Sequence, residues 1–325
     1  MVQLIMFARD HKKRPLLPAL LILAGLLALT AGCGVFADYA RDNNLHVGSL
    51  GLKDFISPVR LRVGVLTFRD EVGLGTPEAG PNLAGLVSDK FAENGDIVVV
   101  PPEEVLSAAR ARGWNGDPLT PELAMELGRE LDLNVVMDGA ISQIEEQSVR
   151  RGWRRIARFF TSRQQYVDTV LTLVAYDSAT GLVISARAGE SSYRVGKNDT
   201  DPFAPESRQA LSQETIEESL DLAIEDTYYR TLDGLAYTPF KAMVVDVSGG
   251  TATIRYGLDV GLKRGQKFVS LSHWETLTSS IDIQYNVPGA AKARLTVLEV
   301  GPRSAELEIT EGSLSRGDFI QSWND

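Results

Sequence analysis

The side chains that most often carry enzyme chemistry are sparse in this chain of 325 residues. It has one cysteine, Cys33, and two of its three histidines, His46 and His273, lie beyond the first 32 residues without a partner at metal-ligand spacing. The sequence contains no G-x-S-x-G, no phosphate-binding loop and no H-E-x-x-H motif. We therefore predict no catalytic, cofactor-binding or metal-binding residues, and no cofactor.

Acidic residues are abundant and could in principle supply an acid and a base. Adjacent pairs such as Glu145 with Glu146 and Glu217 with Glu218 are more typical of solvated faces. A ligand-binding enzyme of unknown class stays open as an alternative function. It would need a pocket in which titratable groups with perturbed pKa values converge.

The cysteine closes an apolar run from Leu16 to Cys33, LLPALLILAGLLALTAGC, which follows Lys12, Lys13 and Arg14. A basic stretch followed by roughly sixteen apolar or small residues is typical of a secretory signal. The run is shorter than the ~20 residues that span a bilayer comfortably. The sequence therefore predicts export. An uncleaved anchor helix is the alternative, and both interpretations attach the protein to a membrane.

The end of this run, L-T-A-G-C, resembles the lipobox of bacterial lipoproteins. The resemblance implies that residues 1–32 are a signal peptide, that the Cys33 sulfur is acylated with a chain such as palmitate, and that Cys33 becomes the first mature residue. Thr30 stands where leucine is commoner. Gly34 after the cysteine, in place of aspartate, favours outer-membrane sorting with the protein facing the periplasm, and inner-membrane anchoring stays open.

The charge balance bears on partners and on stability. The chain carries 33 Lys and Arg against 43 Asp and Glu, a formal net charge of −10. Nucleic-acid binding, which needs clustered cations to replace counterions, is therefore not expected. Acylation of Cys33 would leave no thiol for disulfides, so packing alone must stabilise the fold.

The periodicity of apolar residues predicts two folded domains behind a tether. Residues 33–58 sustain no period and form the predicted tether. Residues 59–236 alternate strand and helix patterns, which predicts an α/β or α+β module with a mixed sheet and flanking helices. Thr120 before Pro121 is typical of a helix N-cap, and Gly234 is expected to end the last helix. We expect strands at 59–68, 96–100, 133–144, 166–176 and 182–194, and helices at 83–91, 102–112, 120–131 and 213–232.

Residues 237–325 change character. Short alternating strands at 242–247, 251–256, 267–272, 291–300 and 304–309, separated by Gly and Pro, predict a small all-β domain of the barrel or sandwich type. Gly257, Gly261 and Gly265 supply turn conformations there. They follow no strand-to-helix junction, so they do not predict a phosphate site.

Several motifs carry a family resemblance. V-L-T-F, V-V-V-P-P, E-L-G-R-E-L-D-L-N-V-V-M-D-G-A-I and the D-x-x-T-G turn at 177–181 resemble the periplasmic α/β module of the curli secretion lipoproteins. This module is similar to the amino-terminal domain of the Tol-Pal protein B and to the middle domain of flagellar assembly protein T. The run G-L-D-V-G-L-K-R-G-Q-K-F and the later S-R-G-D-F-I at 315–320 resemble the carboxy-terminal domain of flagellar assembly protein T.

The resemblance implies a non-enzymatic envelope lipoprotein that acts as an assembly or docking factor. Its setting would be the flagellar basal body or a curli-like secretion apparatus. The implied partners are the membrane, through acylated Cys33, and envelope or flagellar proteins. Because relatives of the module form rings, a homo-oligomeric ring is also implied.

An arginine-rich segment from Arg150 to Arg163 interrupts the module. It is either a solvated hairpin tip or short helix, or a contact for anionic lipid headgroups or an acidic partner. Curli channels place a membrane hairpin near this point, so an oligomeric outer-membrane secretion pore is a further alternative, although such strands need roughly ten alternating residues with an apolar face. The candidate contact residues are Arg150, Arg151, Trp153, Arg154, Arg155, Arg158, Phe159 and Phe160.

Overall fold

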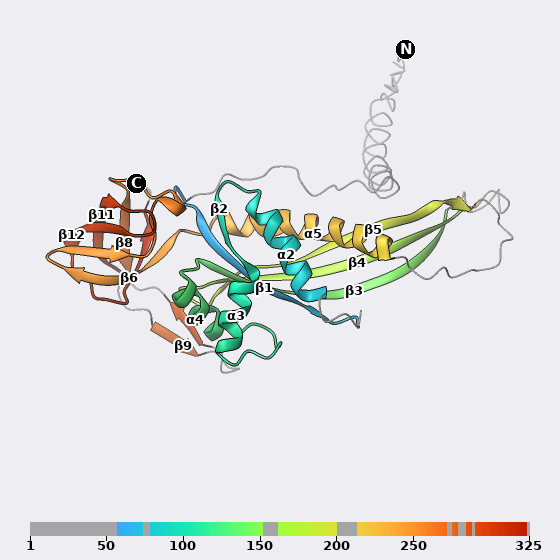
Figure 1. Ribbon diagram of the computed structural model, residues 1–325, viewed down its shortest axis with the longest axis horizontal. Coiled ribbons are helices and arrows are strands. Elements are labelled where there is room, and N and C mark those ends of the chain that lie inside the picture. Colours follow the sequence, from blue (N-terminus) through green and yellow to red (C-terminus); the bar gives the residue numbers. More distant parts are fainter. Residues whose placement is uncertain are drawn as a thin grey trace, which may run out of the picture. The chain divides into compact units, whose positions relative to one another are not determined.

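The computed structural model in Figure 1 describes residues 57–73, 79–151, 162–199, 213–271, 275–278, 284–287 and 290–323. Residues 48–325 group into one compact unit, distinct from residues 1–47. The predicted signal peptide, Cys33 and the predicted tether up to residue 56 lie outside the described residues. All of the described helices and strands belong to the second unit.

A five-stranded mixed sheet forms the first half of this unit, in the order β2-β1-β3-β4-β5. Strand β1 runs parallel to β2 and β3, whereas β3, β4 and β5 form an antiparallel meander. The predicted mixed sheet is thereby confirmed. The strands are β1 (Leu61–Asp70), β2 (Ile97–Val100), β3 (Val135–Arg151), β4 (Ser162–Asp177) and β5 (Val183–Asp199).

Helices cover both faces of the sheet, as its two-sided apolar pattern requires. On one face α2 (Ala79–Ala92) and α5 (Gln213–Leu235) pack over β1, β3, β4 and β5 (Figure 1). On the other face α3 (Pro102–Ala111) and α4 (Pro121–Leu131) pack on Leu66 of β1 and form a smaller core. Alternation along β1 supplies both cores, since Leu61, Val63 and Val65 face the first and Leu66 faces the second. The register shift between Val65 and Phe68 returns Phe68 to the first core.

The helix termini follow the local sequence. The Thr120 side chain accepts a hydrogen bond from the N–H of Leu123 at 3.3 Å, which confirms the predicted N-cap of α4. Asp132 ends α4 with φ 53°, and its N–H donates to the carbonyl of Gly128. Pro102 occupies the start of α3, where a missing N–H costs no hydrogen bond.

The second half is a closed barrel of six strands, in the order β11-β12-β7-β6-β13-β8. This confirms the small barrel-like domain. Phe240, Tyr256 and Phe268 pack edge to face, with ring centroids 4.9 and 6.1 Å apart, in a core continuous with that of the sheet. The barrel strands are β6 (Lys241–Ser248), β7 (Thr251–Ile254), β8 (Lys267–Leu271), β11 (Ala291–Val300), β12 (Ala305–Gly312) and β13 (Phe319–Ser322); β9 (Glu275–Thr278) and β10 (Gln284–Val287) pair separately.

Some boundaries differ from the prediction. Strand β3 continues past residue 144 to Arg151 and β5 past residue 194 to Asp199, because both pair with β4 along its length. Helix α5 does not end at Gly234. It includes Leu235, whose side chain is fully buried, so burial outweighs the helix-ending preference of glycine.

Candidate interaction surfaces

The groups that usually bind metals do not gather within the described ranges: no three His, Cys, Asp or Glu side chains there are placed to hold one ion. Cys33, His46 and His273 lie outside these ranges. In the part of the chain that is described, no helix is long and apolar enough to cross a membrane. Lipidation of Cys33 stays a prediction.

The arginine-rich segment begins in the last residues of β3 and ends in the first residues of β4, and residues 152–161 between them lie outside the described residues. Backbone pairing places Arg150 opposite Arg163 and Arg151 opposite Ser162. The two ends of the segment are thus paired strands, and the expected hairpin tip or short helix between them stays a prediction. The other candidate contact residues, Trp153, Arg154, Arg155, Arg158, Phe159 and Phe160, lie outside the described residues.

Strands β3, β4 and β5 form a ribbon that extends beyond helix α5 (Figure 1). Ser219 of α5 contacts Thr169 of β4, with hydroxyl oxygens 2.7 Å apart. From there to Gln213 the helix rises about 9 Å, whereas β4 runs about 23 Å from Thr169 back to Ser162. The start of β4 at Ser162 therefore lies roughly 14 Å beyond the start of α5 at Gln213.

The outer edge of β5 is partly closed by helix α5. Asp226 is 3% exposed, and its Oδ2 accepts a hydrogen bond from the backbone N–H of Glu190 at 3.1 Å and from Nε of Arg230 at 2.7 Å. A carboxylate thus takes the donor that would otherwise face an added strand. This buried aspartate was not singled out from the sequence.

A crevice of about 790 Å³ opens at the carboxyl end of β1. One wall is the end of β1 from Thr67 to Glu71, and the others are the start of α2, the end of α3 and the loop after it. Arg69 forms an ion pair with Asp138 of β3, which is 4% exposed and also accepts from the N–H of Leu119 at 3.1 Å. Burial raises the pKa of the Asp138 carboxyl, opposed by the Leu119 N–H and by Arg69.

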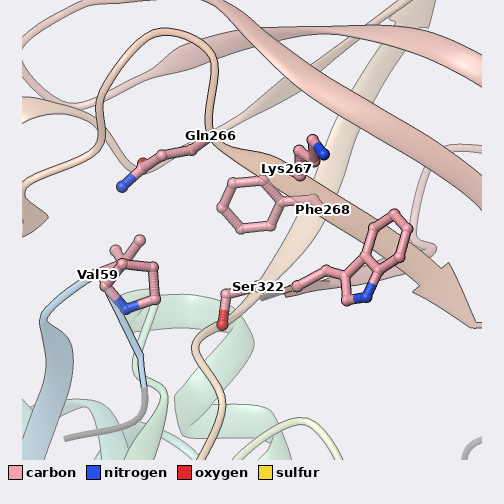
Figure 2. A pocket seen from close by; sticks show the side chains of 7 residues that line it. Val59, Gln266, Lys267, Phe268 and Ser322 are labelled. Carbon is pink, nitrogen blue, oxygen red and sulfur yellow. The ribbon is translucent and has the colours of Figure 1, made fainter. Parts of the chain in front are cut away.

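A smaller pocket of about 270 Å³ lies between the start of β1 and the barrel. Figure 2 shows Val59 across from Gln266, Phe268 and Ser322, with Lys267 beside them. Trp323 also lines the pocket. Its ring lies 4.8 Å from the Arg294 guanidinium and 5.9 Å from Lys267 Nζ, so two cations flank the indole. Both cations that contact the Trp323 ring therefore come from strands of the barrel itself.

Charged and aromatic side chains join the sheet to the barrel. Arg62 of β1, 3% exposed, forms an ion pair with Asp259 and lies 5.1 Å from the ring centroid of Tyr256. The Tyr256 hydroxyl donates to the carbonyl of Asp132 at 2.7 Å, and Arg255 pairs with the Asp132 carboxylate at 2.8 Å. Burial raises the pKa of the Asp132 carboxyl, opposed by Arg255 and Arg62.

A second set of contacts connects the five-stranded sheet to the barrel. Asn134 accepts from the N–H of Arg62 at 2.8 Å and donates through Nδ2 to the carbonyl of Lys241 at 2.6 Å. Lys241 forms an ion pair with Asp177 at the D-x-x-T-G turn. The D-x-x-T-G turn therefore also holds the first barrel strand, β6, against the sheet.

The crevice residues were missed from the sequence. The signal that could have found them is positional, since ligands of open α/β sheets bind outside the carboxyl ends of the strands. Arg69 follows the V-L-T-F strand directly, and Trp114 follows the helix that leads out of β2.

No protein-family model matches the sequence, and no curated protein sequence matches it either. Solved structures do align with part of the chain. The PelC dodecamer from Paraburkholderia phytofirmans aligns with a TM-score of 0.29 and 13% identity, over 52% of this chain and 88% of that chain.

Two further structures are similar over a comparable share. Lipoprotein GNA1162 from Neisseria meningitidis has a TM-score of 0.32 and 11% identity, over 43% of this chain and 88% of that chain. The LpoB C-terminal domain from Escherichia coli has a TM-score of 0.29 and 17% identity, over 45% and 89%. At these TM-scores and identities the likeness carries no conclusion about this chain.

Proposed function

We propose that this chain is a non-enzymatic lipoprotein of the bacterial envelope that acts as an assembly or docking factor. Export and acylation are supported by the basic residues before the apolar run and by its L-T-A-G-C ending at Cys33. In this proposal the lipid holds the protein at the outer membrane, facing the periplasm, because acyl chains in combination anchor a protein stably.

The observation that carries the docking role is the ribbon of β3, β4 and β5. Three paired strands reach past α5, and the connection from β3 to β4 carries six arginines among fourteen residues, in a chain whose net charge is −10. A concentrated positive charge at the end of a projecting element attracts acidic surfaces over about a Debye length. The partner it selects is an acidic envelope protein or the anionic face of a membrane.

The finer assignment rests on sequence resemblance. The motifs shared with curli secretion lipoproteins and with flagellar assembly protein T support a role in flagellar basal-body assembly or a curli-like secretion apparatus. They also support a homo-oligomeric ring and partners among envelope or flagellar proteins. Residues 1–32 are the signal peptide, 33–58 the tether, 59–236 the α/β module and 237–325 the β-domain in this proposal.

Anchoring is tested by metabolic palmitate labelling of the full-length chain. We expect label in the wild type and none in Cys33→Ser, with the variant released from the membrane fraction. Label that persists in Cys33→Ser would rule out this residue as the acylated one. Membrane retention without label would instead favour the uncleaved anchor helix.

Docking is tested by cross-linking in the envelope, followed by identification of the linked proteins. The ribbon variant replaces Arg150, Arg151 and Arg163 with alanine. A control with the same loss of charge replaces the exposed residues Arg187, Arg303 and Arg316. The same envelope partner should cross-link to wild type and control and be lost from the ribbon variant. A wild-type protein that stays monomeric and links to no envelope protein would refute the proposal.

A further inference from the structure

A groove of about 730 Å³ lies on the outer surface of the barrel, over the end of β11. One side is the loop that begins with the 3₁₀-helix η1 (Leu258–Val260) and leads into β8, and the other side is β12. Strand order fixes this arrangement, because β11 lies between β8 and β12. Two backbone hydrogen bonds of 2.9 Å hold the loop against β11, from the N–H of Gly265 to the carbonyl of Val297 and from the N–H of Val297 to the carbonyl of Gln266.

The floor of the groove is apolar, and one of its side chains is strongly exposed. Leu262, Leu298 and Val300 line the groove. Leu258 of η1 lines it as well and is 60% exposed, more than any other large apolar side chain among the described residues. Apolar side chains that gather at one place on a surface mark interaction sites, whereas scattered ones do not. The groove is therefore a candidate contact surface.

The two sides of the groove carry opposite charges. Its basic side consists of Lys263 and Arg264, both exposed on the loop. Its acidic side consists of Glu299 of β11 and Glu306 of β12, also exposed. Glu308, the next outward residue of β12, extends the acidic side. The groove is thus polarised from the loop toward β12.

These four lining charges are not neutralised by the barrel. None of them forms an ion pair within the ranges that the structure describes. Backbone pairing nevertheless places Glu299 directly opposite Glu306, and like charges at such positions are destabilising. Elsewhere the same two strands bring opposite charges together, since Arg294 of β11 pairs with Glu311 of β12 at 3.4 Å. A cation from outside the chain would offset the two facing glutamates.

Two further charges near the groove interact with the sheet half of the molecule instead. Asp259 of η1 pairs with Arg62 and accepts from the N–H of Gly257 at 2.9 Å. Arg303, in the turn after β11, lies within electrostatic reach of Asp132 at the end of α4. The charges free to meet a partner at the groove are therefore those of its basic and acidic sides.

We propose that this groove is the surface at which a second copy of the chain binds, related to the first by a two-fold axis. In a two-fold dimer the same patch lies on both partners and must be complementary to itself. An apolar centre with cations on one side and anions on the other meets this condition. The rotation brings the basic side of one copy onto the acidic side of the other, and Leu258 of each copy covers apolar floor of its partner.

The presence of both signs of charge selects the second copy over other occupants. A uniformly acidic partner, such as an anionic membrane face, would place like charge against Glu299 and Glu306, and a uniformly basic partner would do so at the loop. Burial of a charge without its counter-charge is costly. A second copy supplies both counter-charges from the same patch. This contact goes beyond the proposed docking role, because it uses the barrel and not the arginine-rich ribbon.

Site-specific photo-cross-linking reads out this contact in the full-length protein in detergent. The photo-cross-linker p-benzoylphenylalanine replaces Leu258, whose exposure lets the larger side chain be accommodated. We expect illumination to give a covalent dimer, with the linked peptide of the second copy in the η1 loop, β11 or β12. Co-purification of two differently tagged copies that keep Leu258 measures the same pairing without the added group.

Charge reversal tests the complementarity. The all-acidic variant is Lys263→Glu with Arg264→Glu, and the all-basic variant is Glu299→Lys with Glu306→Lys. Each variant alone should give at least about tenfold less cross-linked dimer than the parent protein, because like charges then face each other. A mixture of the two should restore the dimer, since each altered side then meets its complement. This recovery would also show that both variants are folded.

Arg187→Glu with Arg316→Glu is the matched control, because these exposed arginines lie outside the groove and the change in net charge equals that of the all-acidic variant. It should dimerise like the parent protein. The proposal fails if neither the cross-link nor co-purification links two copies, or if residue 258 links only to a different envelope protein. It also fails if either reversed variant keeps full dimer yield, or if their mixture gives none. Palmitate labelling at Cys33 and cross-linking through the ribbon report on other residues, so failure here is distinguishable from failure of the proposed function.

Discussion

Tyr256 offers a measurement of how strongly the sheet and the barrel are joined. Its side chain is 4% exposed, and its hydroxyl donates to the carbonyl of Asp132 at 2.7 Å. Tyr256→Phe removes this hydrogen bond and keeps the ring, which packs edge to face on Phe240. A hydrogen bond of this kind contributes about 0.5–1.5 kcal/mol, so we expect the free energy of unfolding to fall by about 1 kcal/mol.

Tyr256→Ala separates the ring from the hydroxyl. It also removes the aromatic contact with Phe240, 4.9 Å between centroids, and the surface over which the Arg62 guanidinium lies. Truncation of a buried aromatic side chain costs about 3–5 kcal/mol. The alanine variant should therefore lose at least twice as much stability as the phenylalanine variant.

Urea unfolding, followed by fluorescence and by circular dichroism, measures both variants. If the sheet and the barrel unfold as one unit, fluorescence and circular dichroism report the same transition. The variants then lower the urea midpoint without changing the dependence of the unfolding free energy on urea concentration. Tyr237→Phe is the control, because Tyr237 is 56% exposed and its variant should stay within about 0.5 kcal/mol of wild type. A Tyr256→Phe variant as stable as wild type, or separate transitions for the two probes, would refute the reasoning.

Two further predictions concern the module. A Cβ at Gly139 would lie 2.3 Å from Cε1 of the buried Phe68, so Gly139→Ala should lose roughly 1–3 kcal/mol in urea unfolding. Gly85→Ala in α2 adds a methyl group that meets no heavy atom within 4 Å outside its chain neighbours and the nearby helix backbone, so it should instead gain roughly 0.5–1 kcal/mol. Equal effects of the two substitutions would contradict this prediction. Burial raises the pKa of Asp138 above 3.8, so the folded state holds this proton more tightly and stability is lost as pH rises from 3.8 through the folded pKa. Relative to Asp138→Asn, the wild type should lose stability over that window in unfolding titrations, and a constant difference would contradict the assignment.

Local sequence patterns predicted helices and strands well where a single local preference, such as helix capping or apolar alternation, decides the structure. The N-cap at Thr120 and the start of α3 at residue 102 depend on local sequence, and both occur as expected. The mixed sheet and the small barrel followed from alternating apolar residues in the two halves. The four-residue strand β13 was missed, because Phe319 to Ser322 is too short to display a period.

The features that depend on distant contacts were not predictable. The ribbon is longer than expected because β3 and β5 gain hydrogen bonds from β4, which no pattern within either strand reveals. Arg110 and Arg112 look alike in the sequence, and the acidic residues of α4 decide which one is engaged. The site residues of the crevice likewise come from three separate parts of the chain.

The carboxylate of Asp226 has a consequence for how copies of this protein can meet. Strand β5 is long and lies at the edge of the sheet, the feature through which β-proteins most readily add strands and aggregate. By occupying the N–H of Glu190 and holding Arg230 beside it, Asp226 interrupts the row of donors midway along that edge. Pairing of another strand with this part of the β5 edge is thereby disfavoured. Ordered assembly at faces and loops is favoured over pairing at this part of β5, and the side chains on such surfaces can discriminate one partner from another.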